Sequence, residues 1–393
     1  MTMVSGAAPA TATRAAPAPG LDLKAALQRM VREGASDLHL KVGRPPTLRL
    51  HGDLVALEMP PMRPEELRAL AEHLLPPAQL REFVEFRESD FAINVPGIGR
   101  FRVNVYQQKG TVAFAMRAIA HAASSVRDLN LPPVIEQIAM RPRGLVLVTG
   151  VTGSGKSTAV AAMIQYINER RGANVITIED PIEFVHPHRN SIITQREVGV
   201  DCESWNVALK NTLRQAPDVI LIGEVRDRET MEHAVSFAET GHLVMCTLHA
   251  NSTNQALDRI VNFFPEEKRQ QLLMDLSLNL RALVSQRLIP LKDRKGRVPA
   301  VEILLNSPLV SDLIFKGEIQ EIREVMKRSR EQGMQTFDQM LFDLHEKELI
   351  SYEDALRNAD SVNDLRLQIK LNSKLYGGVA AIHKGIEHMG LAG

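Results

Sequence analysis

Cysteine is scarce in this 393-residue chain, which contains only Cys202 and Cys246. Two thiols cannot build the disulfide framework of a small secreted domain, and they cannot supply a four-cysteine zinc site. A reducing compartment is therefore the expected location of the protein. Cys246 lies within an apolar, strand-like run, which favours an inert core residue over a reactive thiol.

The chain also lacks an excess of either charge and any long apolar run. Lysine plus arginine equal aspartate plus glutamate, at 47 each, which argues against a surface adapted to nucleic acid. No apolar stretch approaches the roughly 20 residues that cross a bilayer, and the N-terminus lacks the pattern of a signal peptide. We expect a soluble, cytoplasmic protein without direct membrane insertion, so that any role at a membrane requires a partner.

The first part of the chain predicts a tail and a small α+β domain. Residues 1–20 are rich in Ala, Pro and Thr and hold too few bulky apolar groups to fold, which predicts a disordered tail. Residues 21–118 form the predicted domain, and residues 119–128 read as a linker. The expected helices cover 21–34, 64–75 and 78–87, and the expected strands fall within 37–57, 89–95, 100–107 and 111–118.

Residues 129–305 alternate strand and helix patterns, which predicts a parallel sheet with helices on both faces. Strands are expected at 145–148, 175–178, 218–222 and 242–248, with a hairpin over 287–305. Helices are expected at 132–140, 158–167, 203–214, 228–238 and 254–263. Leucines at helical spacing predict one further helix face: Leu272, Leu273, Leu276, Leu280 and Leu283. Residues 306–372 are expected to be helical and 373–393 to be a flexible tail.

One stretch carries the strongest chemical signal. The apolar run Leu145–Val148 precedes Gly150–Ser157, which matches the phosphate-loop pattern G-x-x-x-x-G-K-[ST], and a helical pattern follows. Glycines let backbone N–H groups turn toward a phosphate chain, and the helix adds its positive end. Lys156 is expected to reach the β- and γ-phosphates of ATP, and the Ser157 hydroxyl to bind Mg²⁺. The expected nucleotide contacts are Gly150, Thr152, Gly153, Ser154, Gly155, Lys156, Ser157 and Thr158.

Two acidic motifs follow predicted strands, and ligands of open parallel sheets bind at the carboxyl ends of strands. Glu179–Glu183 places three carboxylates within five residues, so a cation or a proton is needed to relieve their repulsion. Glu183 is the candidate for orienting or activating the attacking water, with a solvated acidic turn as the alternative. Glu224 follows the strand Asp218–Ile222 in a Walker B arrangement, where it would hold Mg²⁺ through water or polarise the attacking water. Gly223 replaces the usual aspartate, and a surface glutamate is the alternative reading.

Two histidines, His242 and His249, bracket the next predicted strand. Their odd separation points them to opposite faces of a strand, which makes them a poor metal pair. His249, at the carboxyl end, is placed to sense a γ-phosphate. His242 is placed for a domain or subunit contact, or is a hydrogen-bonded core histidine. His186 and His188 stand beside prolines and are interpreted as surface residues.

Three arginines of the first domain complete the set of candidates. Arg100 and Arg102 share one face of a predicted strand, and Arg117 ends the next strand. Arginine stabilises the charge of a phosphoryl group in transfer, and a neighbouring subunit can supply it. Structural ion pairing is the alternative fate of these side chains.

Taken together, the motifs resemble the Walker A, Asp box, Walker B and His box of the type II/IV secretion-system ATPase superfamily. The four boxes are Gly150–Thr158, Ile178–His186, Gly223–Asp227 and Glu239–His249. Ala35–Leu40 and Arg100–Asn104 resemble the PAS-like N-terminal domain of the type IV pilus retraction ATPases, the PilT/PilU family. Resemblance to the PilU branch rests on Leu243–Ser252, Phe263–Arg269, Met274–Arg281 and Asn358–Arg366.

The resemblance implies an α/β fold in which a PAS-like α+β domain precedes a RecA-like P-loop ATPase domain and a helical C-terminal region. It implies a homohexamer that binds ATP and Mg²⁺ between subunits, at the inner face of the cytoplasmic membrane. Hydrolysis would move each N-terminal domain against a neighbouring ATPase domain, and an inner-membrane pilus platform protein would pass the motion to the fibre. The residues that carry over are Lys156, Ser157, Glu183, Glu224, His242, His249, Arg100, Arg102 and Arg117.

Three functions remain open at this point. The leading hypothesis is an ATPase that drives pilus retraction and twitching motility. The second is an accessory ring subunit that modulates a paralogous retraction ATPase, with its own hydrolysis dispensable. It is favoured because Leu309–Gly317 stands where the motor branch carries its retraction motif. The third, a pilus assembly or type II secretion ATPase, is disfavoured because that branch usually carries a four-cysteine zinc site.

Overall fold

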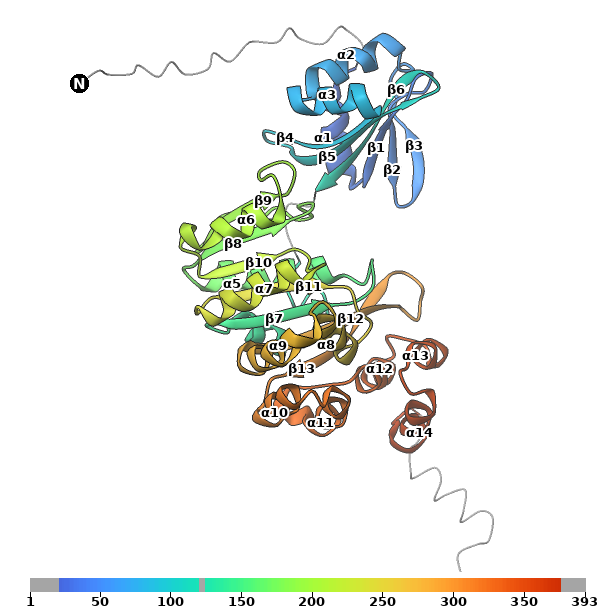
Figure 1. Cartoon of the computed structure of the whole chain (residues 1–393). Helices are drawn as coiled ribbons and strands as arrows, with labels where there is room; N and C mark the ends of the chain where they lie inside the picture. Colours follow the sequence, from blue (N-terminus) through green and yellow to red (C-terminus); the bar gives the residue numbers. More distant parts are fainter. Residues whose placement is uncertain (1–20, 120–123, 376–393) are drawn as a thin grey trace, which may run out of the picture. The chain divides into compact units, whose positions relative to one another are not determined.

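The computed structural model describes residues 21–119 and 124–375, and the chain divides into two compact units, Met1–His121 and Ala122–Gly393 (Figure 1). We call them the N-terminal and the C-terminal unit. The predicted tail 1–20, the last eighteen residues of the predicted tail 373–393 and residues 120–123 of the predicted linker lie outside the described residues. The linker prediction therefore stays a prediction, although Val126, within it, is buried in the C-terminal unit.

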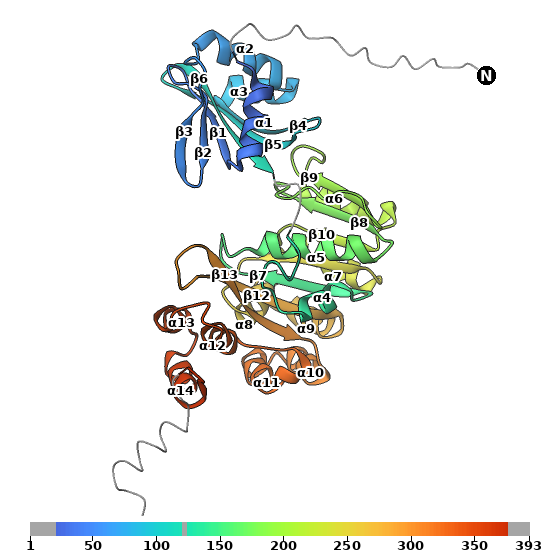
Figure 2. The ribbon, with the colours of Figure 1, turned by 180° about the vertical axis from the view of Figure 1, so that it is seen from behind.

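The described N-terminal unit is a six-stranded antiparallel sheet in the order β3-β2-β1-β6-β5-β4, with three helices over one face (Figures 1 and 2). Its strands are β1 Asp37–Leu40, β2 Thr47–Leu50, β3 Asp53–Ala56, β4 Glu88–Val95, β5 Gly99–Gln108 and β6 Thr111–Ile119. Its helices are α1 Leu23–Glu33, α2 Pro64–Leu74 and α3 Pro77–Phe86. These elements agree with the predicted α+β pattern.

Strand alternation explains why the helices cover only one face of this sheet. Leu38 of β1 and Phe101 of β5 are fully buried in one cluster with Leu27 of α1. Because neighbouring side chains on a strand point to opposite faces, Arg100 and Arg102 lie on the face away from the helices. The prediction that these two arginines share a face is confirmed.

The C-terminal unit is built on a seven-stranded sheet in the order β13-β12-β7-β11-β10-β8-β9. Every neighbouring pair is parallel except β12 with β13. The strands are β7 Gly144–Thr149, β8 Asn174–Glu179, β9 Ile192–Glu197, β10 Val219–Ile222, β11 Leu243–Leu248, β12 Leu280–Pro290 and β13 Arg297–Leu305. The parallel sheet predicted from alternation is therefore present, and the carboxyl ends of β7, β8, β10 and β11 share one edge.

Helices cover both faces of this sheet, as Figures 1 and 2 show. Val146 and Val148 of β7 pack with α4 and α5, whereas Leu145 and Leu147 pack into the cluster formed with α6 to α9. The helices are α4 Val134–Ala139, α5 Lys156–Arg170, α6 Trp205–Thr212, α7 Arg228–Glu239, α8 Thr253–Asn262 and α9 Glu266–Asn279, with a 3₁₀ turn η1 at Leu213–Gln215. Burial on both faces explains why β7 reads as a continuous apolar run.

Two parts of this unit differ from the sequence prediction. Leu272 and Leu276 are buried on α9, but Leu280 and Leu283 belong to β12 and not to a helix, because α9 ends at Asn279. β12 pairs in parallel with the interior strand β7, so both faces of β12 are buried and its apolar residues do not alternate with polar ones as in a half-exposed strand. The expected hairpin is present but begins earlier, and the edge strand β9 was not predicted.

Five helices follow β13 in the described chain, and the last three of them pack against the β12–β13 hairpin (Figure 1). The five helices are α10 Pro308–Lys316, α11 Ile322–Arg328, α12 Phe337–Glu346, α13 Tyr352–Asn358 and α14 Val362–Asn372, with 3₁₀ turns η2 Ile319–Glu321 and η3 Arg330–Gln332. Phe337 and Leu341 of α12 share a buried cluster with Ile289 of β12 and Val298 of β13. The predicted helical character of this region is confirmed.

Arg287 of β12 connects these helices to the strand edge. Its guanidinium donates to the backbone carbonyls of Asn251 at 3.0 Å and Asn358 at 2.8 Å, and pairs with Asp360 at 2.8 Å. It also lies 3.8 Å from the centroid of the Phe337 ring. Asn251 belongs to the loop after β11, so one side chain links that loop to α12 and to the α13–α14 connection.

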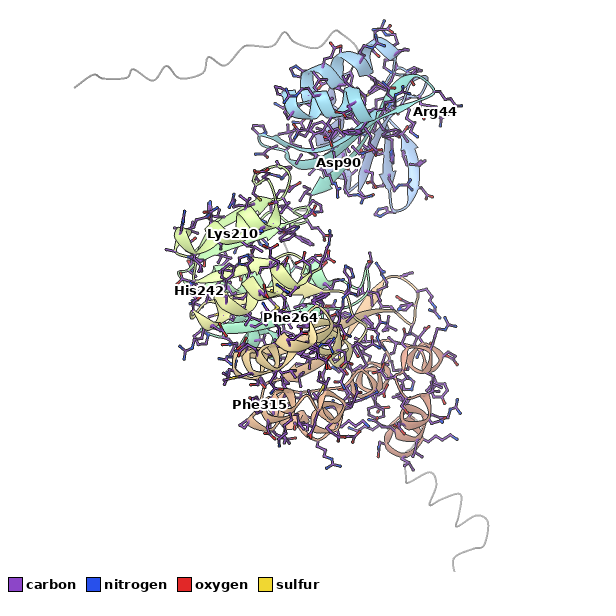
Figure 3. All side chains as sticks on the ribbon, in the orientation of Figure 1. Arg44, Asp90, Lys210, His242, Phe264 and Phe315 are labelled. Carbon is purple, nitrogen blue, oxygen red and sulfur yellow. The ribbon has the colours of Figure 1, made fainter. Side chains whose placement is uncertain are left out.

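Replacing Phe337 tests this packing. Phe337 is fully buried, so Phe337→Ala leaves a cavity and is expected to cost about 3–5 kcal/mol of unfolding free energy, measured by denaturant titration. The control Phe315→Ala, on the surface of α10 (Figure 3), removes a ring that is 44% exposed and is expected to cost much less. Equal shifts of the two midpoints would contradict the assigned core.

Candidate active site

The phosphate loop lies between β7 and α5, against strand β12. All residues of β7 are buried, and α5 begins at Lys156, directly after the loop. Gly150 has φ of 152°, and a Cβ added there would stand 2.5 Å from the Gln286 carbonyl oxygen. At Gly155, with φ of 88°, a Cβ would stand 2.7 Å from the Gln286 side-chain nitrogen. Positive φ at both positions, and the Gln286 backbone beside Gly150, favour glycine, so the pattern reflects backbone conformation and close packing.

Lys156 is buried at the start of α5. Its ammonium donates to the carbonyl oxygens of Gly150 at 2.8 Å and Val151 at 3.1 Å, which holds the loop closed around it. Burial lowers the pKa of Lys156, and the charges of Glu224 and Glu183 act in the opposite direction. The two acidic residues proposed from different motifs therefore both lie within electrostatic reach of this lysine.

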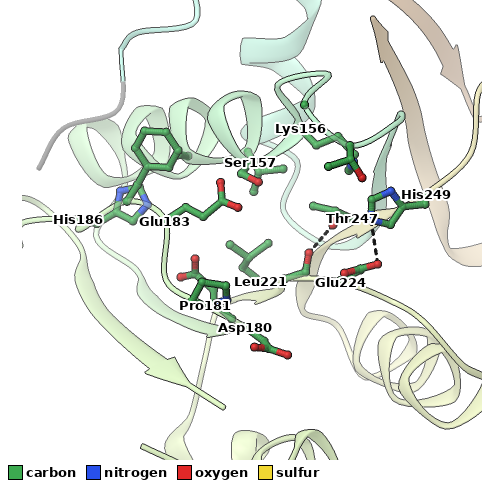
Figure 4. A pocket seen from close by; sticks show the side chains of 17 residues that line it. Lys156, Ser157, Asp180, Pro181, Glu183, His186, Leu221, Glu224, Thr247 and His249 are labelled. Carbon is green, nitrogen blue, oxygen red and sulfur yellow. Dashed lines mark hydrogen bonds and ion pairs between the residues drawn. The ribbon is translucent and has the colours of Figure 1, made fainter. Parts of the chain in front are cut away.

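A pocket of about 220 Å³ lies beside the loop at the carboxyl ends of the strands (Figure 4). Among the predicted residues it is lined by Thr152, Gly153, Lys156, Ser157, Glu183, Glu224 and His249. The other predicted nucleotide contacts, Gly150, Ser154, Gly155 and Thr158, lie in the same loop and the first turn of α5. One chain thus brings together groups from the Walker A, Asp box, Walker B and His box segments.

Glu224 is held in place by two neighbours. Its carboxylate lies 2.7 Å from an Arg226 guanidinium nitrogen and 3.0 Å from His249 Nε2, and 20% of its side chain is exposed. Burial lowers the pKa of His249, and Lys156 adds to this effect, so at neutral pH its Nε2–H donates to Glu224 as a neutral imidazole. Arg226 was not among the predicted site residues.

Gly223 explains why the usual aspartate is missing before Glu224. A Cβ at this position would stand 3.1 Å from both the Ile178 carbonyl oxygen and the Glu179 Cα of the neighbouring strand. The carbonyl of Gly223 also accepts a hydrogen bond from the Thr247 hydroxyl on the other side. The end of β10 is therefore packed too closely between β8 and β11 for a side chain to fit easily.

The three carboxylates of the Asp box have different surroundings. Asp180 and Glu183 are exposed, whereas burial raises the pKa of Glu179. Glu179 accepts hydrogen bonds from the Thr177 hydroxyl at 2.7 Å and from Gln195 Nε2 at 3.1 Å. Burial thus favours the neutral form at Glu179, whereas Asp180 and Glu183 reach the pocket from the exposed part of the loop.

His186 is not the surface residue that the sequence suggested. It is 7% exposed, lines the pocket beside α5, and its Nδ1 has no hydrogen-bond partner among the described residues. Burial lowers its pKa to about 4, so it is neutral at neutral pH. The prediction failed because the loop folds back onto α5, which no local pattern reports. His188 is exposed, as expected.

The other predicted residues are not among those that line this pocket. His242 precedes β11 and contacts the Phe237 carbonyl at 3.0 Å, at the opposite end of the strand from His249 (Figure 3). Arg102 pairs with Asp90 at 3.9 Å and Arg117 with Asp37 at 2.8 Å, all within the N-terminal unit. Within one chain these two arginines form ion pairs, and their proposed contact with nucleotide stays a prediction, as does that of Arg100.

A comparison with known protein families shows to which family this chain belongs. The model of the type II/IV secretion system protein family matches residues 20–346. The chain belongs to this family. The type IV pilus ATPase PilU of Pseudomonas aeruginosa is 52% identical over 354 residues, which cover 90% of this chain and 93% of that protein. The type IV pilus retraction ATPase PilT of the same organism is 41% identical over 339 residues, or 86% and 98% of the two chains.

A solved structure agrees with this assignment. The pilus retraction motor PilT with bound ADP superposes with a TM-score of 0.82 at 40% identity, covering 88% of this chain and 99% of that chain. The predicted fold class, an N-terminal domain followed by a RecA-like ATPase domain and a helical region, is confirmed. Across residues 21–119 and 124–375, no helix has the length and apolar character needed to span a bilayer.

His186 makes the stability of the protein sensitive to acid. Its pKa is about 4 in the folded protein and 6.5 as an ordinary histidine, so the unfolded chain binds more protons between these values. The unfolding free energy is expected to fall by about 3 kcal/mol from this residue as the pH drops from 6.5 to 4. His186→Gln should remove that part of the slope in denaturant titrations at several pH values, whereas His188→Gln should keep it. An unchanged slope in His186→Gln would contradict the assignment.

Proposed function

We propose that the C-terminal unit binds ATP with Mg²⁺ and hydrolyses it in the pocket at the strand edge. The observation that carries this proposal is the shared pocket of Lys156 and Ser157 with Glu183, Glu224 and His249. A buried cation and an N-terminal helix end bind phosphates, and carboxylates opposite them prepare water for attack. The family assignment and the ADP-bound relative support nucleotide as the ligand.

Each residue has a role in this proposal. The backbone N–H groups from Thr152 to Ser157 and the Lys156 ammonium bind the phosphates, which would replace the loop carbonyls that Lys156 now contacts. The Ser157 hydroxyl and, through water, Glu224 would hold Mg²⁺, which neutralises phosphate charge and polarises the phosphoryl group. The oxygen donors of these residues suit that ion.

The water would be prepared from the opposite side of the pocket. Glu183 orients the attacking water or accepts its proton, and Glu224 assists by polarising it. His249 holds Glu224 through its neutral Nε2–H and faces the position of the γ-phosphate. Because Glu224 is bound by both His249 and Arg226, its carboxylate is fixed before nucleotide arrives, which lowers the reorganisation that the reaction requires.

The biological role proposed is type IV pilus retraction and twitching motility, driven or assisted by this ATPase. The 52% identity to PilU supports it. The active form would be a homohexamer at the inner face of the cytoplasmic membrane, working with a paralogous retraction ATPase and a membrane platform protein. Arg100, Arg102 and Arg117 would reach the nucleotide of a neighbouring subunit, and His242 would contact another domain or subunit. Hydrolysis would then move the domain 21–118 against an ATPase domain.

An accessory role is the second candidate. The segment Leu309–Gly317, which replaces the retraction motif of the motor branch, forms α10 and its glycine cap. Leu309 and Phe315 of this helix are 54% and 44% exposed, so the segment presents a surface of its own. In this case the chain would bind and modulate the paralogous motor, and its own hydrolysis would be dispensable.

Glu224→Gln separates binding from turnover. The amide keeps the size of the side chain but removes its charge, so the protein should retain Mg²⁺–ATP while turnover falls on the order of 10²- to 10⁴-fold. Binding of a fluorescent ATP analogue and phosphate release by the full chain measure the two effects. The control Glu229→Gln, on the exposed first turn of α7, should behave as the parent. Parental turnover in Glu224→Gln would refute the role of Glu224.

Retraction in cells distinguishes the two candidates. In a strain that lacks the paralogous motor, a retraction motor should support fibre shortening, and Glu224→Gln should abolish it. Labelled pili followed by fluorescence microscopy give the measurement. If the parent chain moves no fibre in that strain, but Glu224→Gln supports normal retraction when the paralogue is present, the accessory role replaces the leading one.

A further inference from the structure

Gln195 lies on β9, the strand that the sequence did not predict, and faces the loop that carries Glu183. In the parallel pairing of β8 with β9 it stands beside Thr177. The loop Asp180–His186 leaves the end of β8, passes the pocket and returns toward β9. Gln195 is half-buried beneath it.

The side-chain amide of Gln195 makes three hydrogen bonds to this loop and its base. Its Nε2 donates to Glu179 Oε1 at 3.1 Å and to the Phe184 carbonyl at 2.8 Å, and its Oε1 accepts from the His186 backbone N–H at 2.8 Å. These bonds use both N–H groups and the carbonyl oxygen. If the amide were turned over, its NH₂ group would face the His186 N–H and its oxygen would face the oxygens of Glu179 and Phe184. These partners therefore define the orientation of the amide.

Glu179 extends this arrangement to Glu183 itself. The Glu179 carboxyl accepts from the Thr177 hydroxyl and from Gln195, and the nearby backbone N–H of Glu183 acts to lower its pKa against the effect of burial. Gln195 therefore holds the loop directly at Phe184 and His186, just after Glu183, and also holds Glu179, whose carboxyl interacts with the Glu183 backbone, at the start of the loop. The Glu183 side chain is exposed at the pocket, so its position depends on the backbone that carries it.

We infer that Gln195 is a positioning residue for ATP hydrolysis: through Glu179 and the loop backbone, it fixes Glu183 opposite Lys156 and Ser157. Gln195 does not line the pocket and so does not touch the phosphates. Its loss should therefore slow the chemical step and leave nucleotide binding nearly intact, because a misplacement of about 1 Å at a reacting group costs on the order of 10²-fold. The inference rests on the proposed role of Glu183.

The test compares variants of the full chain in steady-state and single-turnover ATP hydrolysis. Gln195→Leu removes all three hydrogen bonds, and Gln195→Glu keeps the shape but places a carboxylate against Glu179 and the Phe184 carbonyl. Both should lower kcat on the order of 10- to 100-fold with KM and the affinity for a fluorescent ADP analogue little changed. Gln195→Glu should recover part of its rate toward acid pH, where the added carboxyl regains a proton to donate.

A matched control comes from the same strand. Thr194 is the neighbour of Gln195 and points to the other face of β9, and within the described chain its hydroxyl has no hydrogen bond. Thr194→Val should leave kcat unchanged. The midpoints of denaturant unfolding show whether any variant acts by unfolding the unit instead of by moving the loop.

A double-mutant cycle tests whether Gln195 acts through Glu183. Glu183→Gln should reduce the single-turnover rate, and adding Gln195→Leu to it should cause little further loss, because the group being positioned is already disabled. Equal losses in both backgrounds, a parental kcat in Gln195→Leu, or a loss that appears only in nucleotide affinity would overturn the inference while leaving the proposed hydrolysis intact. A parental rate in Glu183→Gln alone would overturn the inference together with the role proposed for Glu183, while ATP hydrolysis by the chain would stand.

Discussion

Parallel pairing of β7, β8, β10 and β11 is the constraint on which the site depends. Parallel strands end at the same edge, so the segments that follow them in the chain must meet there even though they lie far apart in sequence. The helix after β7 contributes a positive end and a buried lysine, and the loops after β8 and β10 contribute carboxylates. The pocket is therefore a place where opposite charges face each other across a space suited to a phosphate chain and a cation.

The parts of this site that could be predicted are those with local sequence causes. Gly150–Ser157 follows a buried strand and begins a helix, and both facts are visible in neighbouring residues. Glu183, Glu224 and His249 each follow a strand, so parallel topology alone places them at the pocket edge. The alternation of β5 likewise fixed the common face of Arg100 and Arg102, because a strand has a period of two.

The parts that could not be predicted depend on contacts between distant segments. His186 stands in a polar, proline-flanked loop, and its burial comes from the fold of that loop onto α5. β9 is a short edge strand, and the role inferred for Gln195 follows only from its hydrogen bonds to Glu179 and Phe184 on the facing segment. Leu280 and Leu283 share a helical spacing with the residues before them, and only pairing with β7 converts them to strand. Gly223 belongs to this group as well, since its crowding comes from β8.

The loop after His249 is secured by arginines from two different elements. Arg259 of α8 donates to the His249 carbonyl at 2.8 Å, and Arg287 of β12 donates to the Asn251 carbonyl. Arg287 also donates to the Asn358 carbonyl and pairs with Asp360, so one guanidinium joins this loop to the α13–α14 connection. Any displacement of the loop after β11 therefore has to break these bonds or carry the α13–α14 connection with it.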